Sequence, residues 1–138
     1  MKKIYLLFLF NALLVSNKAY AQSYFFYDDF EQYSAGNMLA CQDSINWTTW
    51  HLNPCDTVED SYVTNAYAYS GSNSFVCVAN NDEVHHWGPY TTGHWQIYFY
   101  NYIPAGKSGY FNTLAKFMGE SSEWGLEVFF DPFGNTWV

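Results

Sequence analysis

Three consecutive residues, Gly106, Lys107 and Ser108, match the end of the phosphate-binding P-loop, G-x-x-x-x-G-K-[ST]. That motif binds a nucleotide because its glycine-rich loop and the following helix direct backbone N–H groups at the phosphates. Here Asn101 replaces the first glycine, and the residues after Ser108 favour a strand. A hairpin loop explains the same residues, with Pro104 ending a strand and Lys107 in solvent. We therefore expect no nucleotide here.

Three carboxylates near the end of the chain, Glu123, Glu127 and Asp131, have the residue types that glycoside hydrolysis needs. The two catalytic carboxyls lie about 5–5.5 Å apart in retaining enzymes and about 6.5–9.5 Å apart in inverting ones. Residues i and i+2 of a strand lie about 6.5 Å apart on one face, but these acids are four residues apart. Glu127 and Asp131 would form a catalytic pair only with the help of a bulge or of another strand.

Aromatic side chains are abundant, and exposed rings bind sugars through the apolar C–H faces of the sugar. Trp47, Trp50 and Trp87 lie in predicted loops, so we expect them to be exposed. Tyr98 and Tyr100 share one face of a predicted strand and are the second candidates. The alternative is that these rings fill the core, because β-sandwiches bury many aromatic side chains.

The first 21 residues predict a signal peptide. A basic start is followed by an apolar run over 4–16 and by Ala19-Tyr20-Ala21, which is the usual cleavage pattern. Cleavage before Gln22 would leave 22–138 as one secreted domain with no stable membrane span. An N-terminal anchor that is not cleaved is the alternative.

The charge of the chain limits its partners. It has 13 acidic residues against 5 basic ones, for a net charge of −8. Without the predicted leader, Lys107 and Lys116 are the remaining cations, and two lysines against 13 acids give −11. Binding phosphate requires cations, so nucleic acids and anionic membranes are poor partners for this chain. A neutral ligand or a bound cation fits better.

The cysteines also fit export, because an oxidising compartment lets two of the three form a disulfide. Cys41 and Cys55 would close a short loop, which favours this pair over one that includes Cys77. No C-x-x-C motif and no Cys/His zinc spacing occurs. We expect a Cys41–Cys55 disulfide and no structural zinc.

The elements that must position these residues are mostly strands. Aromatic and β-branched runs predict strands at 24–31, 62–69, 73–79, 94–103, 109–117 and 124–131. In the 94–103 run, Trp95, Ile97 and Phe99 face one way while Tyr98 and Tyr100 face the other. Short two-faced strands separated by regular turns favour an all-β sandwich or barrel.

Four stretches that occur in order resemble a known family: FEQYSAG (30–36), INWTTWHLNP (45–54), VEDSYVTNAYAYSGSNSFVC (58–77) and YNYIPAGKSGYFNTL (100–114). They look like the concanavalin A-like/laminin-G-like β-jelly-roll module of secreted bacterial proteins, often proteins exported by the type IX secretion route. The resemblance covers about 28–131 and implies a two-sheet jelly-roll sandwich. In that family the module continues for several more strands beyond the point that corresponds to Val138, so the resemblance also implies a fragment of a longer protein or a shortened gene product.

The resemblance suggests one metal site. Exported β-sandwiches often hold a structural calcium, which takes carboxylate oxygens as ligands. Asp28 and Glu31 belong to the first predicted strand and Asp131 to the last, and these strands are neighbours in a jelly roll. The chain has no dense calcium loop such as D-x-D-x-D-G, so a solvated acidic surface is the alternative.

These patterns predict a secreted, non-catalytic β-sandwich module that binds a glycan or another component of an extracellular surface. A jelly-roll glycoside hydrolase fragment that uses Glu127 and Asp131 is the first alternative. A purely structural spacer domain, with its rings buried throughout, is the second. The fold analogy carries much of this expectation, and one fold hosts many functions.

Overall fold

Antiparallel strand pairs form most of the regular structure in the computed structural model, which describes residues 26–88, 90 and 92–138. The predicted signal peptide and residues 22–25 lie outside these residues. The elements, in chain order, are α1 (Leu39–Gln42), β1 (Trp47–Thr49), β2 (Tyr62–Thr64), β3 (Ser74–Val76), β4 (Glu83–His85), β5 (Gly109–Lys116), β6 (Glu123–Phe130) and β7 (Thr136–Trp137). The described chain is therefore β-rich, with little helix.

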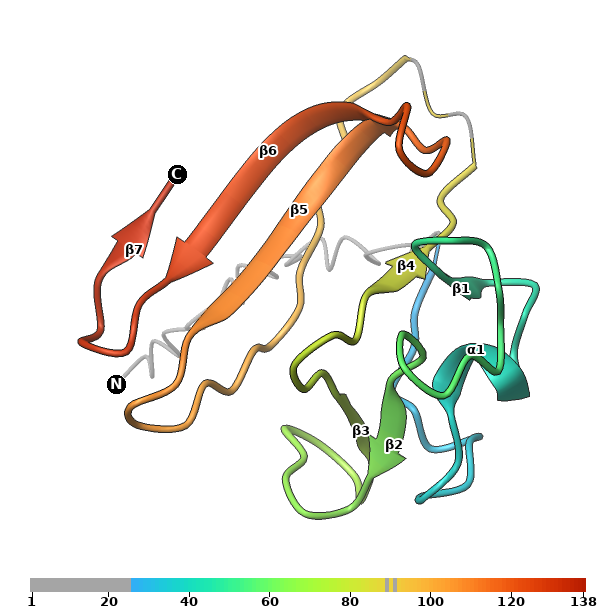
Figure 1. Cartoon of the computed structure of the whole chain (residues 1–138), viewed down its shortest axis with the longest axis vertical. Coiled ribbons are helices and arrows are strands. Elements are labelled where there is room, and N and C mark those ends of the chain that lie inside the picture. Colours follow the sequence, from blue (N-terminus) through green and yellow to red (C-terminus); the bar gives the residue numbers. More distant parts are fainter. Residues whose placement is uncertain (1–25, 89, 91) are drawn as a thin grey trace, which may run out of the picture.

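The strands form three separate antiparallel sheets, β1–β4, β2–β3 and β5–β6–β7. Trp47 lies opposite His85 in the first sheet, and Val63 lies opposite Phe75 in the second. Figure 1 shows the four short strands and α1 gathered at one side, while the long β5–β6 hairpin extends away from them and carries β7 along its outer edge. The β-rich class predicted from the sequence is present, in the form of several small sheets.

A small hydrophobic core lies between α1 and the two short sheets. Its buried members are Tyr33, Leu39, Ala40, Trp47 and Val63, with Phe30 and Phe75 packed against them. Val63 is the central residue of β2 and points inward, while its neighbours in that strand are half-buried. One of the sequence-predicted ring candidates, Trp47, is a member of this core.

A buried carboxylate connects this core to the disulfide. Asp60 is completely buried, and its oxygens accept backbone N–H groups from Ala40 at 3.0 Å, Cys41 at 3.0 Å and Cys55 at 2.9 Å. Cys41 and Cys55 form a disulfide, and they are the pair that the sequence favours. The sulfur of Cys77 lies 3.2 Å from the Ser61 hydroxyl oxygen instead. Asp60 therefore holds the backbone at both cysteines of the disulfide through hydrogen bonds.

Some predicted strands are present and others are not. β2, β3 and β5 lie inside predicted strands and β6 begins one residue before one, whereas 94–103 contains no strand. The described part of 24–31 also contains none, because the Asp28 and Asp29 carboxylates accept the N–H groups of Phe30 and Glu31 and bend the chain into turns. The sequence pattern does not predict β1, β4, β7 or α1, because these elements are too short to give a clear period.

The β5–β6 hairpin is irregular near its turn. Asn112 pairs with Glu127, Leu114 with Trp124 and Lys116 with Glu123, so the register shifts twice. Gly125 sits in the first shift, where a Cβ atom would lie 2.9 Å from the carbonyl oxygen of Thr113. Only glycine allows this close approach of the two strands.

Candidate functional site

Trp47 is buried, which corrects the expectation that this ring is exposed. Only 8% of its surface is accessible, and its Nε1 donates a hydrogen bond to Asp28 Oδ2 at 3.1 Å. The ring packs against Phe75 and against the edge of His85. Pairing of β1 with β4 turns the predicted loop into a strand and directs this side chain into the core, so Trp47 cannot contact a ligand.

The other two candidate tryptophans, Trp50 and Trp87, make different ring contacts. Trp50 is half-buried and stacks on Trp124 of β6, with ring centres 5.6 Å apart and an interplanar angle of 24°. Trp87 is 51% exposed and contacts Phe26 and His85. No contact joins Trp50 to Trp87 among the ring pairs of the described chain. They therefore do not form one platform for a sugar.

The tyrosines do gather into one exposed surface, made by the loop after β2 and the 94–103 segment. Tyr69 and Tyr100 stack face to face, with ring centres 3.3 Å apart and planes 9° apart. Tyr67 and Tyr102 form a second pair at 4.8 Å. Each of these rings, and Tyr98 beside them in sequence, is more than 60% exposed. We call this surface the tyrosine patch; its members are Tyr67, Tyr69, Tyr98, Tyr100 and Tyr102.

The two segments that form the tyrosine patch contain no charged side chain. Neither the 65–72 loop nor the 94–103 segment contains Asp, Glu, Lys or Arg. The pKa of the Tyr100 hydroxyl is raised by its hydrogen bond with the Tyr69 hydroxyl, so Tyr100 stays protonated at neutral pH. The Tyr98 hydroxyl donates to the Gln96 side-chain oxygen at 3.0 Å. The surface thus combines broad ring faces with uncharged hydrogen-bonding groups at its rim.

The candidate catalytic carboxylates have structural partners. The Tyr110 hydroxyl donates to Glu127 across the hairpin at 3.0 Å. Asp131 accepts the backbone N–H groups of Phe133 and Asn135 and the side-chain amide of Asn135, which closes the turn before β7. The register from Glu127 to Phe130 is regular, with no bulge to bring the acids together. Asp131 directly follows the end of β6, and four residues of extended chain span about 13 Å, which exceeds both catalytic distances.

Of the candidate calcium ligands, Asp28 and Glu31 lie in the loop before α1, whereas Asp131 lies in a different loop. Asp28 accepts bonds from Phe30, Gln32, Tyr33 and Trp47, while Glu31 accepts the N–H groups of Ser72 and Asn73. Asp131 belongs to the turn after β6. Within the described residues, no group of three or more His, Cys, Asp or Glu side chains is placed to hold a metal ion.

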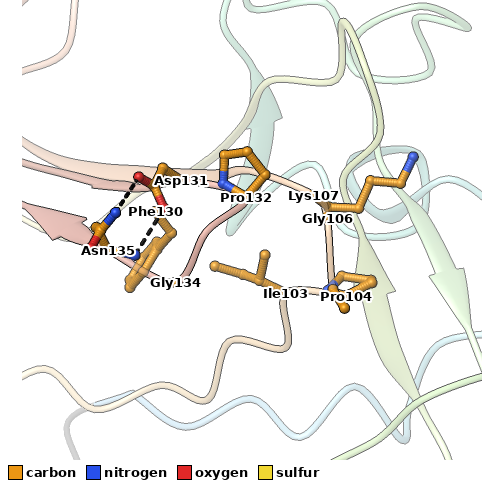
Figure 2. A pocket seen from close by; sticks show the side chains of 10 residues that line it. Ile103, Pro104, Gly106, Lys107, Phe130, Asp131, Pro132, Gly134 and Asn135 are labelled. Atoms are coloured by element: carbon orange, nitrogen blue, oxygen red, sulfur yellow. Dashed lines mark hydrogen bonds between the residues drawn. The ribbon is translucent and has the colours of Figure 1, made fainter.

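The P-loop-like stretch borders a small hollow of about 140 Å³ between Ile103–Lys107 and Phe130–Asn135. Figure 2 shows Ile103 and Phe130 facing one another across it, while the Lys107 side chain extends away. The N–H of Lys107 bonds to the carbonyl of Pro104 at 3.0 Å, which is a tight turn. No helix follows Ser108, because β5 begins at Gly109. The geometry is that of a hairpin loop.

One polar cluster was not found from the sequence. His51 bonds to Glu59 through Nδ1, and its Nε2 lies 3.5 Å from Glu120. The hydrogen bond to Glu59 raises the pKa of His51. Glu120 lies in the turn between β5 and β6, far away in the sequence, so no spacing could have indicated this contact.

Comparison with family models, curated proteins and solved structures gave no match to this chain. In the part of the chain that the structure describes, no helix is long and apolar enough to cross a bilayer.

Proposed function

We propose that this chain is a secreted, non-catalytic β-sandwich module of the jelly-roll kind that binds a neutral glycan on an extracellular surface. The observation that carries the proposal is the tyrosine patch, in which stacked, exposed rings come from two separate segments that contain no charged side chain. Sugar rings bind to such faces through their C–H groups, while their hydroxyls bond to polar groups at the rim.

Two further features support this choice of ligand and compartment. The net charge of −8 disfavours anionic partners, whereas a neutral glycan meets no repulsion at the patch. The Cys41–Cys55 disulfide suits an oxidising compartment, as export through a signal peptide over 1–21 would provide.

Glycan binding can be tested by titration calorimetry, after a neutral-glycan array has identified the sugar. Tyr69→Ala and Tyr100→Ala should each weaken binding about two- to tenfold, because a contact with an aromatic ring is worth about 0.5–1.5 kcal/mol beyond its buried area. Phe133→Ala is the matched control, since its ring is 88% exposed and lies outside the patch.

Three outcomes would contradict the proposal. The first is a lack of binding to any neutral glycan, and the second is an equal loss of affinity in the Phe133→Ala control. The third is hydrolysis of the bound glycan that Glu127→Gln abolishes, which would identify the chain as part of a glycosidase.

A further inference from the structure

The 94–103 segment has the side-chain alternation of a strand but lacks the hydrogen bonds of one. Figure 1 shows it running beside β5, and the Phe99 ring contacts the Phe111 ring edge-on at 4.5 Å. Within the described chain, no backbone N–H or C=O of residues 96–103 has a hydrogen-bond partner. Unpaired backbone groups along an extended, alternating segment are a template for pairing with another strand.

The charge distribution indicates which strand would pair there. Residues 95–106 contain no Asp, Glu, Lys or Arg, although the whole chain has a net charge of −8. Two copies of an acidic protein repel each other over most of their surfaces, but this charge-free stretch lets them approach. The exposed rings along it, with Tyr98 70% and Tyr100 69% accessible, would gain contacts on pairing.

The segment is also self-complementary. In an antiparallel pair related by a two-fold axis through Phe99, Tyr98 of one copy lies opposite Tyr100 of the other, and Ile97 lies opposite Asn101. Both members of each pair lie on the same face, because positions an even number of residues apart share a face. Tyrosine pairs opposite one another stabilise a sheet by about 0.2–1 kcal/mol.

We propose that residues 96–102 pair antiparallel with the same residues of a second copy of this chain, forming a two-fold dimer centred on Phe99. The interface is isologous, so the same residues serve both subunits. The pairing uses backbone groups in the plane of the strands, while the Tyr98 and Tyr100 rings project from that plane. This inference goes beyond the proposed glycan binding and does not depend on it.

The pairing predicts where an engineered disulfide can form. In a Cys77→Ser background, Phe99→Cys places two thiols opposite each other, with Cβ atoms about 4.5–5.5 Å apart. Asn101→Cys is the matched control, because in this register its two copies lie four residues apart, or about 13 Å, beyond the reach of a disulfide. With a mild oxidant and no glycan present, Phe99→Cys should form covalent dimers at least tenfold faster than Asn101→Cys.

Sedimentation equilibrium of the chain with all its own residues provides the second measurement, since it needs no variant to fold. It should show a monomer–dimer equilibrium that shifts toward dimer as NaCl screens the acidic surfaces. A monomer at all concentrations up to about 100 µM, well above the range of a specific dimer, would overturn the proposal. Equal cross-linking rates at positions 99 and 101 would also overturn it.

Discussion

At the scale of single residues, two neighbouring ionisable groups of β4 are held neutral by burial. Glu83 accepts the N–H of Ser61 with one oxygen at 2.8 Å, and its other oxygen has no partner among the described residues. Burial raises the pKa of Glu83 to about 8. Both nitrogens of His85 likewise have no partner in the described chain, and burial lowers its pKa to about 4. Because β4 carries both groups, the free energy of unfolding falls as the pH rises and Glu83 ionises, and it also falls as the pH drops and His85 is protonated.

Glu83→Gln should remove the pH dependence of stability that comes from the Glu83 carboxyl. A carboxyl whose pKa is raised on folding stabilises the protein fully below about pH 4.5 and loses that contribution as the pH rises towards 8. We expect the free energy of unfolding of the natural protein to fall relative to that of Glu83→Gln between pH 5 and 8, by up to about 1.4 kcal/mol per pH unit.

Urea denaturation at several pH values measures this difference. Because His85 is retained in both proteins, its opposite effect below pH 6.5 cancels in the comparison. The exposed Glu123 provides the control for the substitution itself, and Glu123→Gln should change the free energy of unfolding at neutral pH little. Parallel profiles for Glu83→Gln and the natural protein would show that Glu83 is not neutral in the folded state.

At the scale of elements, the β5–β6 hairpin depends on its irregular register. The Thr113 hydroxyl accepts the N–H of Leu126 at 3.1 Å, and Gly125 lets the two strands approach closely at this point. Past the irregular part, the pairing from Asn112–Glu127 to Gly109–Phe130 is regular. The register shifts therefore determine on which face of β6 each of its aromatic side chains lies.

Gly125→Ala should destabilise the chain by about 1–3 kcal/mol, the usual cost of overpacking. The added Cβ would lie 2.9 Å from a backbone oxygen of Thr113, which cannot rotate away as a side chain could. Thermal unfolding followed by circular dichroism measures the loss. Glu123→Ala, at an exposed position of the same strand, is the matched control and should change the midpoint little. Equal thermal midpoints for Gly125→Ala and Glu123→Ala would show that the two strands can move apart to admit the added Cβ atom without a loss of stability.

At the scale of the whole molecule, a small core is surrounded by an acidic surface and by exposed rings. Among the described residues, few hydrophobic side chains are buried, and Val128 is the one that belongs to the sheet of β5, β6 and β7. Trp124, Leu126 and Phe129 of β6 each remain more than 40% exposed. A core of this size leaves folding sensitive to repulsion among the 13 acidic residues.

Salt should therefore stabilise the dilute chain. Raising NaCl from 10 to 300 mM should raise the thermal midpoint by about 4 °C, the effect of roughly 1 kcal/mol in a domain of this size. KCl at equal concentration is the control for a specific effect of sodium and should act identically. A further rise with CaCl₂ at matched ionic strength would indicate a bound calcium, because a ligand that binds the folded state alone stabilises it. An unchanged midpoint in NaCl would mean that acidic repulsion does not limit stability.

The sequence by itself determined the features that depend on local patterns. Alternating ring-rich runs predicted the strands that the structure contains as β2, β3, β5 and β6. The two faces of a strand are visible in the sequence because consecutive residues alternate between them. The short separation of Cys41 and Cys55 favoured the disulfide pair, and the strand after Ser108 excluded a P-loop. Each of these features depends on residues that lie within about fifteen positions of one another in the sequence.

Only the tertiary structure decided which rings are exposed and which meet. Trp47 looked like a loop residue, but pairing with β4 buried it, because a strand that is three residues long owes its position to its partner. Tyr69 and Tyr100 are distant in the sequence, so their stacking depends on how two loops are placed. The 94–103 run has the pattern of a strand without its hydrogen bonds, because a pattern fixes the faces of a segment while pairing requires a neighbour at the right distance.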